Sequence, residues 1–176
     1  MTREELEHAI RATCDVTGDQ ELYVFGSQAV LGQFPDAPEA FRQSAECDVA
    51  LKNLPEKLDL VDAVLGELSP FHRTHGFYVH GISLEAAELP PGWRERAIKV
   101  QNANTDGNIG YCLEVHDLAA SKLVAFRDKD RRFVRVLLVE GLVDSDTLAT
   151  RIDELSVPQV AGYRILKWVE LTTREL

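Results

Sequence analysis

The chain has 176 residues, of which 45% are hydrophobic and 27% are charged, as in an ordinary globular domain. It has no apolar run of membrane-spanning length, a charged N-terminus and three widely spaced cysteines, so we expect a cytoplasmic protein without a membrane span, a secretory signal or a disulfide framework. Its net charge of −10 excludes a broadly basic nucleic-acid-binding surface, and any contact with nucleic acid must be local.

The first fifty residues predict a helix and two strands. Thr2 and Glu5 form a capping-box pattern ahead of an apolar stripe, and Gly18 can end this helix. Residues 22–25 are a continuous apolar run, which is typical of a central strand. Residues 44–51 alternate between apolar and polar side chains, as a strand with one buried face does.

The rest of the chain predicts further strands and helices. We expect strands within 76–83, 97–100 and 111–115, loops over 34–41 and 102–110, and helices over 55–68, 117–138, 145–155 and 158–171. This order predicts an α+β fold, with a mixed sheet and flanking helices followed by a C-terminal helical segment. We assign residues 1–115 to the core and 116–176 to the helical part, and expect both to pack as one compact unit.

Two carboxylates, Glu46 and Asp48, lie one residue apart on the alternating strand and therefore on the same face. Adjacent carboxylates repel each other unless a cation lies between them. Mg²⁺, or Mn²⁺ in its place, is commonly held by such carboxylates together with substrate phosphate oxygens. A solvent-facing row of acids on an edge strand is the structural alternative, and the pair alone does not exclude it.

A Gly-Ser turn follows the first predicted strand. Gly26 lets the backbone approach a ligand closely, and Ser27 lies where the N-cap of a short helix is expected, a position that favours phosphate. A Gly-Ser pair alone carries little information, but its combination with two acids on the next strand is much rarer. Together they predict a nucleotide site.

Six basic residues and two acids lie close together in the predicted helical part. The basic residues are Lys122, Arg127, Lys129, Arg131, Arg132 and Arg135, and the acids are Asp128 and Asp130. This segment predicts either a local nucleic-acid-binding patch or a solvated helix face of mixed charge.

These motifs resemble those of known nucleotidyltransferases. The pattern Gly26-Ser27-Gln28-Ala29-x-x-Gly32, followed by Ser44-x-Glu46-x-Asp48, resembles the signature of the DNA polymerase β-like superfamily. The segment from Leu113 to Val134 is similar to the AbiEii and MenT type of nucleotidyltransferase toxins from bacterial toxin–antitoxin pairs. The similarity spans roughly residues 20 to 140.

The resemblance implies a role for each matching position. Gly26 and Ser27 would hold the triphosphate, Glu46 and Asp48 would bind the metal, and Lys122 would contact phosphate. Asp130 would be a polar catalytic partner or would orient a basic side chain. The resemblance also makes Ser27 and Ser44 candidates for modification by an antitoxin, and RNA contacts would come from four residues of the basic segment, Arg127, Lys129, Arg131 and Arg132.

The sequence departs from the superfamily pattern at two positions. Glu46 stands where the superfamily usually has Asp, and the third carboxylate of a later strand has no clear match. His80 in the 76–83 segment could act as a base, or it could be an ordinary surface histidine. The three histidines His72, His75 and His80 offer too few ligands at a diagnostic spacing for a zinc site.

Three functions follow from these features. The first is an enzyme, a metal-dependent nucleotidyltransferase that moves NMP from an NTP to RNA, notably to tRNA 3′ ends, as the toxin of a toxin–antitoxin pair. The second transfers the nucleotide to a small molecule such as an antibiotic, whose positive charge would suit the acidic protein. The third is a nucleotidyltransferase fold that has lost catalysis and serves as a binding module, which the missing third carboxylate favours.

Overall fold

The computed structural model describes residues 1–176, and the chain divides into two compact units. The first unit comprises Met1–Ala86 and Arg96–Glu114, and the second comprises Ala87–Glu95 and Val115–Leu176. The first contains the whole β-sheet, while the second is helical. The predicted α+β class, with a mixed sheet, flanking helices and a helical C-terminal segment, is confirmed.

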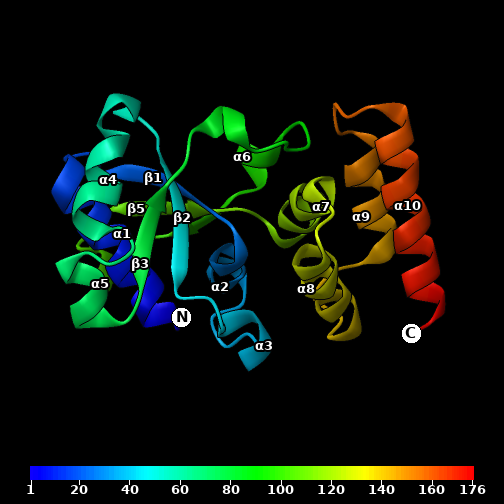
Figure 1. The fold of residues 1–176 in the computed structure, drawn as a ribbon, viewed down its shortest axis with the longest axis horizontal. Coiled ribbons are helices and arrows are strands. Elements are labelled where there is room, and N and C mark those ends of the chain that lie inside the picture. Colours follow the sequence, from blue (N-terminus) through cyan, green and yellow to red (C-terminus); the bar gives the residue numbers. More distant parts are fainter. The chain divides into compact units, whose positions relative to one another are not determined.

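A five-stranded mixed sheet in the order β3-β2-β1-β5-β4 forms the centre of the first unit (Figure 1). The strands are β1 (Glu21–Phe25), β2 (Glu46–Leu51), β3 (Tyr78–Gly81), β4 (Ile98–Val100) and β5 (Ile109–Cys112). Strand β1 runs antiparallel to β2 and parallel to β5, and β2 runs parallel to β3. The central position of β1 explains its continuous apolar run, because both of its faces are covered.

The helices of the first unit are short apart from α1 (Arg3–Thr17) and α4 (Leu58–Leu65), which pack against each other. The others are α2 (Val30–Gln33), α3 (Glu39–Arg42) and α5 (Pro70–His75), and α6 (Trp93–Arg96) follows at the boundary between the units. Both hydrogen bonds of the predicted capping box at Thr2 are present, and Gly18 ends α1 with φ +75°.

Three of the predicted boundaries in the first unit are wrong. The expected loop over 102–110 contains the start of β5, which ends at Cys112 and not at 115. The expected loop over 34–41 contains the start of α3, because Pro38 provides a rigid extended residue before the helix. The apolar stripe of the helix after Pro55 ends at Leu65, which is buried, and Leu68 lies beyond the helix with φ +63° and 71% exposure. Apolar spacing alone therefore overestimated the length of this helix.

The second unit contains α7 (Val115–Ala125), α8 (Asp128–Val139), α9 (Ser145–Asp153) and α10 (Gln159–Arg174). The predicted single helix over 117–138 is wrong, because it is split at Phe126, which has φ +51°, and at the extended N-cap Arg127. The Phe126 ring packs edge-on against Trp168 and beneath the guanidinium groups of Arg131 and Arg164. These contacts stabilise a conformation that the residue disfavours by itself. In neither unit is a helix both long and apolar enough to cross a bilayer.

Candidate active site in the first unit

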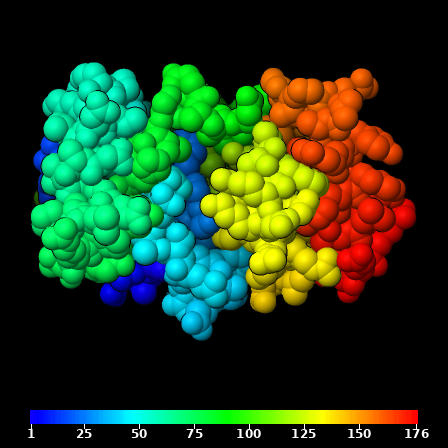
Figure 2. Space-filling view, viewed as in Figure 1, coloured from blue at the N-terminus to red at the C-terminus, as the bar shows by residue number.

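Glu46 and Asp48 lie on the same face of β2, as predicted. Their side chains are half-buried, whereas Cys47, Val49 and Leu51 point into the core. In the space-filling view, the cyan segment that contains β2 and the green segment that contains β3 both reach the surface (Figure 2). Because Glu46 and Asp48 are only partly buried, a ligand can reach both carboxylates from solvent.

Gly26 packs directly against the Asp48 carboxylate. Its neighbour Phe25 is the β1 residue paired with Asp48, so the turn begins where the acid lies. A Cβ atom added to Gly26 would be only 2.0 Å from Asp48 Oδ2. The backbone there has φ +63° and ψ −167°, a combination that essentially only glycine adopts. Both observations require glycine at this position.

The N-cap of the short 3₁₀ helix Ser27–Ala29 is Gly26, so the prediction of Ser27 as the N-cap is wrong. The reason is the same left-handed backbone at Gly26, which places the bend one residue earlier. Ser27 is half-buried and is the first residue of this 3₁₀ helix. Ser44 precedes β2, and its Oγ accepts a hydrogen bond from the Glu46 backbone N–H at 3.2 Å. Ser44 thus lies two residues before Glu46 in the chain, whereas Ser27 follows Gly26, the residue that packs against Asp48.

Strand β3 adds His80 to the two acids. Because β2 and β3 are parallel and in register, Asp48 pairs with His80 and Glu46 pairs with Tyr78. One ligand atom from each of Glu46, Asp48 and His80 lies within 4.8 Å of the others. Of the other two histidines near this part of the chain, His75 packs against His8 and Phe71, and His72 packs against Tyr78.

Asp62 on α4 holds the His80 ring. Its Oδ1 lies 2.9 Å from His80 Nδ1 and accepts a hydrogen bond from the Gly81 backbone N–H at 3.3 Å. The hydrogen bond to Asp62 is the main reason why the pKa of His80 is raised above its ordinary value. Burial opposes this shift, and the negative charges of Asp62, Asp48 and Glu46 add to it.

The pKa of Tyr78, which lies opposite Glu46, is also raised above its ordinary value. Burial is the largest cause of its raised pKa, and the charges of Glu46, Glu67 and Asp48 act in the same direction. A hydrogen bond with the Glu46 carboxylate contributes further. The phenol therefore stays protonated and can donate to the carboxylate.

The residues of this cluster fit a divalent cation. Its donor set consists of two carboxylates and one imidazole on adjacent strands, all of them metal-binding groups. The space that a Cβ would fill at Gly26 is taken by an Asp48 oxygen, so backbone and carboxylate are pressed together at one edge of the cluster. Two negative charges at this separation are stabilised by a bound cation.

Lys122 and Asp130, the other predicted catalytic residues, contact each other in the second unit. Lys122 Nζ lies 3.8 Å from Asp130 Oδ1, and Arg127 Nε donates to Asp130 Oδ2 at 2.6 Å. Asp130 is 1% exposed, so this carboxylate joins the end of α7 to the start of α8. Lys122 also lies over the Phe133 ring, at 4.6 Å from its centre.

The four predicted RNA-binding residues differ in their surroundings. Arg127 pairs with Asp130, and Arg131 pairs with Asp128 while it covers the Phe126 ring. Lys129 and Arg132 are exposed on α8. The acids of the segment thus neutralise part of its basic charge.

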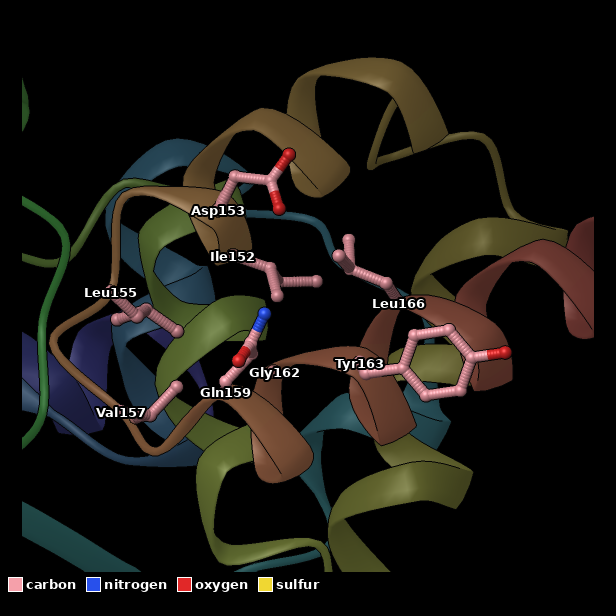
Figure 3. A pocket seen from close by; sticks show the side chains of 8 residues that line it. All are labelled: Ile152, Asp153, Leu155, Val157, Gln159, Gly162, Tyr163 and Leu166. Atoms are coloured by element: carbon pink, nitrogen blue, oxygen red, sulfur yellow. The ribbon is translucent and has the colours of Figure 1, made fainter.

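A cavity of about 450 Å³ in the second unit lies between the end of α9 and the first turns of α10 (Figure 3). Aliphatic side chains such as Ile152, Leu155 and Leu166 line it, together with Tyr163, and Asp153 is its one carboxylate. It lacks the paired acids that the predicted chemistry needs. The cluster on β2 and β3 is therefore the candidate active site.

Sequence reasoning missed Asp62 and left His80 open between a base and an ordinary surface histidine. Asp62 is 18 residues from His80, and nothing in the local sequence marks it as a partner. The contact depends on the packing of α4 against β3, which is a tertiary feature. The sequence places His80 on a predicted strand. It does not show the register of β2 and β3, which sets His80 opposite Asp48.

No curated protein and no solved structure matches the chain. Residues 4–173 match the model of a family described as a nucleotidyltransferase of unknown function (DUF6036). This match covers nearly the whole chain, including the Gly-Ser turn, both acids of β2 and all four helices of the second unit. The chain belongs to this nucleotidyltransferase family.

Proposed function

We propose that this nucleotidyltransferase transfers NMP from an NTP to RNA, with tRNA 3′ ends as the preferred acceptor, and that it acts as the toxin of a toxin–antitoxin pair. The observation that carries nucleotidyl transfer is the contact of Gly26 with Asp48, beside Glu46 on the same face of β2. At this contact, a glycine turn whose backbone a phosphate can approach lies beside a pair of metal-binding carboxylates. Nucleotidyl transfer requires both features.

Glu46 and Asp48 would hold the divalent cation, Mg²⁺ or Mn²⁺. When bound, the cation neutralises charge on the phosphates and stabilises the displacement at the α-phosphate. The Gly26–Ser27 turn would lie beside the triphosphate, and the absence of a side chain at Gly26 lets the Asp48 carboxylate lie against this turn. Lys122 keeps its predicted role as a phosphate contact on the strength of the resemblance, and Asp130 can fix its position through their contact.

The basic segment supports RNA as the acceptor. Lys129 and Arg132 are exposed on one helix, although the protein as a whole is acidic. The pairing of Arg127 and Arg131 with acids favours the second candidate, transfer to a small cationic molecule, because it leaves fewer charges for RNA. The toxin role rests on the similarity of Leu113–Val134 to the AbiEii and MenT type, and an antitoxin would be the partner protein.

Label transfer tests this proposal. The protein is incubated with each α-phosphate-labelled NTP, Mg²⁺ or Mn²⁺, and either total RNA or a pool of aminoglycosides. We expect labelled tRNA with one preferred NTP and no label on the small molecules. Label confined to the small molecules would replace the RNA proposal by the second candidate.

An Asp48→Ala variant, checked for its fold by circular dichroism, is the control for the site. It should transfer no label, because one of the two metal-binding carboxylates is missing. Equal labelling by this variant and the wild type would reject the assignment of Asp48. Absence of transfer by the wild type to any acceptor would favour the third function, a binding module.

A further inference from the structure

The side chain of His80 lies beside the two acids Glu46 and Asp48. It is the direct partner of Asp48 across the β2–β3 pair, and its ring lies within reach of both carboxylates. Register fixes this placement, because a shift by one residue would move His80 to the opposite face of the sheet. The backbone thus delivers an imidazole to the carboxylate pair.

The ring is also held in a defined orientation. Asp62 Oδ1 lies 2.9 Å from Nδ1, so the proton of neutral imidazole is held on Nδ1 and the lone pair is left on Nε2. Gly81 allows α4 to come this close, because an added Cβ would be 2.9 Å from Leu58 Cγ and 3.1 Å from Asp62 Oδ2. A carboxylate behind a histidine in this way is the usual support of a metal-ligating imidazole.

We propose that His80 is the third protein ligand of the cation held by Glu46 and Asp48, that Asp62 is its positioning residue, and that this donor set selects Mn²⁺ over Mg²⁺. The inference rests on the proposed function, since it concerns the same site. An imidazole nitrogen is a poor ligand for Mg²⁺, which prefers oxygen, whereas Mn²⁺ accepts both oxygen and nitrogen. A nucleotidyltransferase with a histidine here should therefore use a different ion from one with three carboxylates.

Metal binding to the NTP-free protein tests the proposal without any assay of activity. Free Mn²⁺ is measured by electron paramagnetic resonance, and Mg²⁺ affinity follows from its competition with Mn²⁺. We expect His80→Ala to weaken Mn²⁺ binding by about tenfold or more while changing Mg²⁺ binding by less than about threefold. His80→Asp should reduce the ratio of Mn²⁺ to Mg²⁺ affinity by about tenfold, because it supplies a third carboxylate.

Asp62→Asn should weaken Mn²⁺ binding by about tenfold, since the amide no longer fixes the tautomer of His80. The matched control is Asp59→Asn, which removes an exposed carboxylate from the first turn of the same helix and should leave Mn²⁺ affinity unchanged. Circular dichroism of each variant establishes that the fold is retained.

Electron spin-echo modulation gives the direct readout of ligation. Bound Mn²⁺ should show coupling to an imidazole nitrogen in the wild type, and this coupling should disappear in His80→Ala. Persistence of the coupling in the variant, or its absence from the wild type, would overturn the assignment and leave His80 as the surface partner of Asp62. If Mn²⁺ binding depends on Asp48 but not on His80, this inference fails while the proposed function stands. If no ion binds at all, both fail.

Discussion

At the scale of single residues, Gly26 carries the strictest requirement in the molecule. Its backbone occupies a region open essentially only to glycine, and the Asp48 carboxylate fills the volume of a side chain. Most glycines of a turn are required for their conformation alone. Here the steric contact with Asp48 adds a second reason, which couples the turn to the acids of β2.

Gly26→Ala should therefore lower the free energy of unfolding by about 1–3 kcal/mol and displace Asp48 so that Mn²⁺ binding is lost. Urea denaturation and paramagnetic resonance measure the two effects. Gly107→Ala is the matched control, because Gly107 also has positive φ, at +74°, but an added Cβ would meet nothing within 4 Å. It should lose some stability and keep Mn²⁺ binding. Intact Mn²⁺ binding in Gly26→Ala would contradict the coupling.

Asp19 stabilises the fold through the hydrogen bonds of its buried carboxylate. It is 2% exposed, and its carboxylate accepts hydrogen bonds from the backbone N–H groups of Glu21, Asn53 and Leu54 and from the Asn53 side chain. Burial is the largest single influence and would raise its pKa. The four hydrogen bonds outweigh burial, and the pKa of Asp19 lies below its ordinary value.

Asp19→Asn should cost about 1–3 kcal/mol at neutral pH, because the amide cannot accept all four hydrogen bonds. The folded-state pKa is depressed, so this contribution is fully present above the unfolded-state pKa of about 3.9 and is lost as the pH falls through the lower folded-state value. The difference in unfolding free energy between wild type and variant, measured in urea, should be constant above about pH 5 and shrink below pH 4. A difference independent of pH would contradict this role.

At the scale of elements, some features of the fold follow from local sequence patterns and others depend on tertiary contacts. The caps of α1 and the alternation of β2 were predicted from the sequence, because each depends on residues a few positions apart. The split between α7 and α8 was not, because it depends on the packing of Phe126 against Trp168, 42 residues later. The site divides in the same way, since Glu46 and Asp48 are neighbours in sequence whereas Asp62 and His80 meet only through the fold.

The junction of α7 and α8 depends on Asp130. Asp130→Asn should lower the free energy of unfolding by about 1.5–3 kcal/mol, because it weakens charged hydrogen bonds of a buried carboxylate that contacts Arg127 and Lys122. Asp128→Asn is the control on the same helix, since Asp128 is 76% exposed and its pair with Arg131 should contribute less than about 1 kcal/mol. Equal effects in urea denaturation would show that Asp130 has no special structural role.

At the scale of the whole molecule, the net charge of −10 opposes binding of the proposed RNA acceptor, whereas the exposed basic residues of α8 favour it. The acidic surface repels RNA in general, so productive binding has to come from a few local contacts. Such binding should be weak, salt-sensitive and confined to the basic helix.

A Lys129→Glu, Arg132→Glu double variant should reduce labelling of RNA by about tenfold and lower the slope of log affinity against log salt concentration by about two, because it removes two phosphate contacts. Mn²⁺ binding should not change, because neither residue belongs to the metal site. Lys167→Glu on α10 serves as the control for charge reversal on another helix and should label RNA as the wild type does. Unchanged RNA labelling by the double variant would remove α8 from the RNA interface.

Release of pyrophosphate from NTP tests the central claim most directly, because every nucleotidyl transfer produces it whatever the acceptor. Wild type, Glu46→Gln and Asp48→Asn are compared with total RNA and Mn²⁺; these substitutions preserve side-chain shape and remove one negative charge each. We expect release by the wild type and a loss of about a hundredfold or more in both variants, since each lacks a metal-binding carboxylate. Release by either variant at the wild-type rate would contradict the claim that the acid pair on β2 is the catalytic metal site.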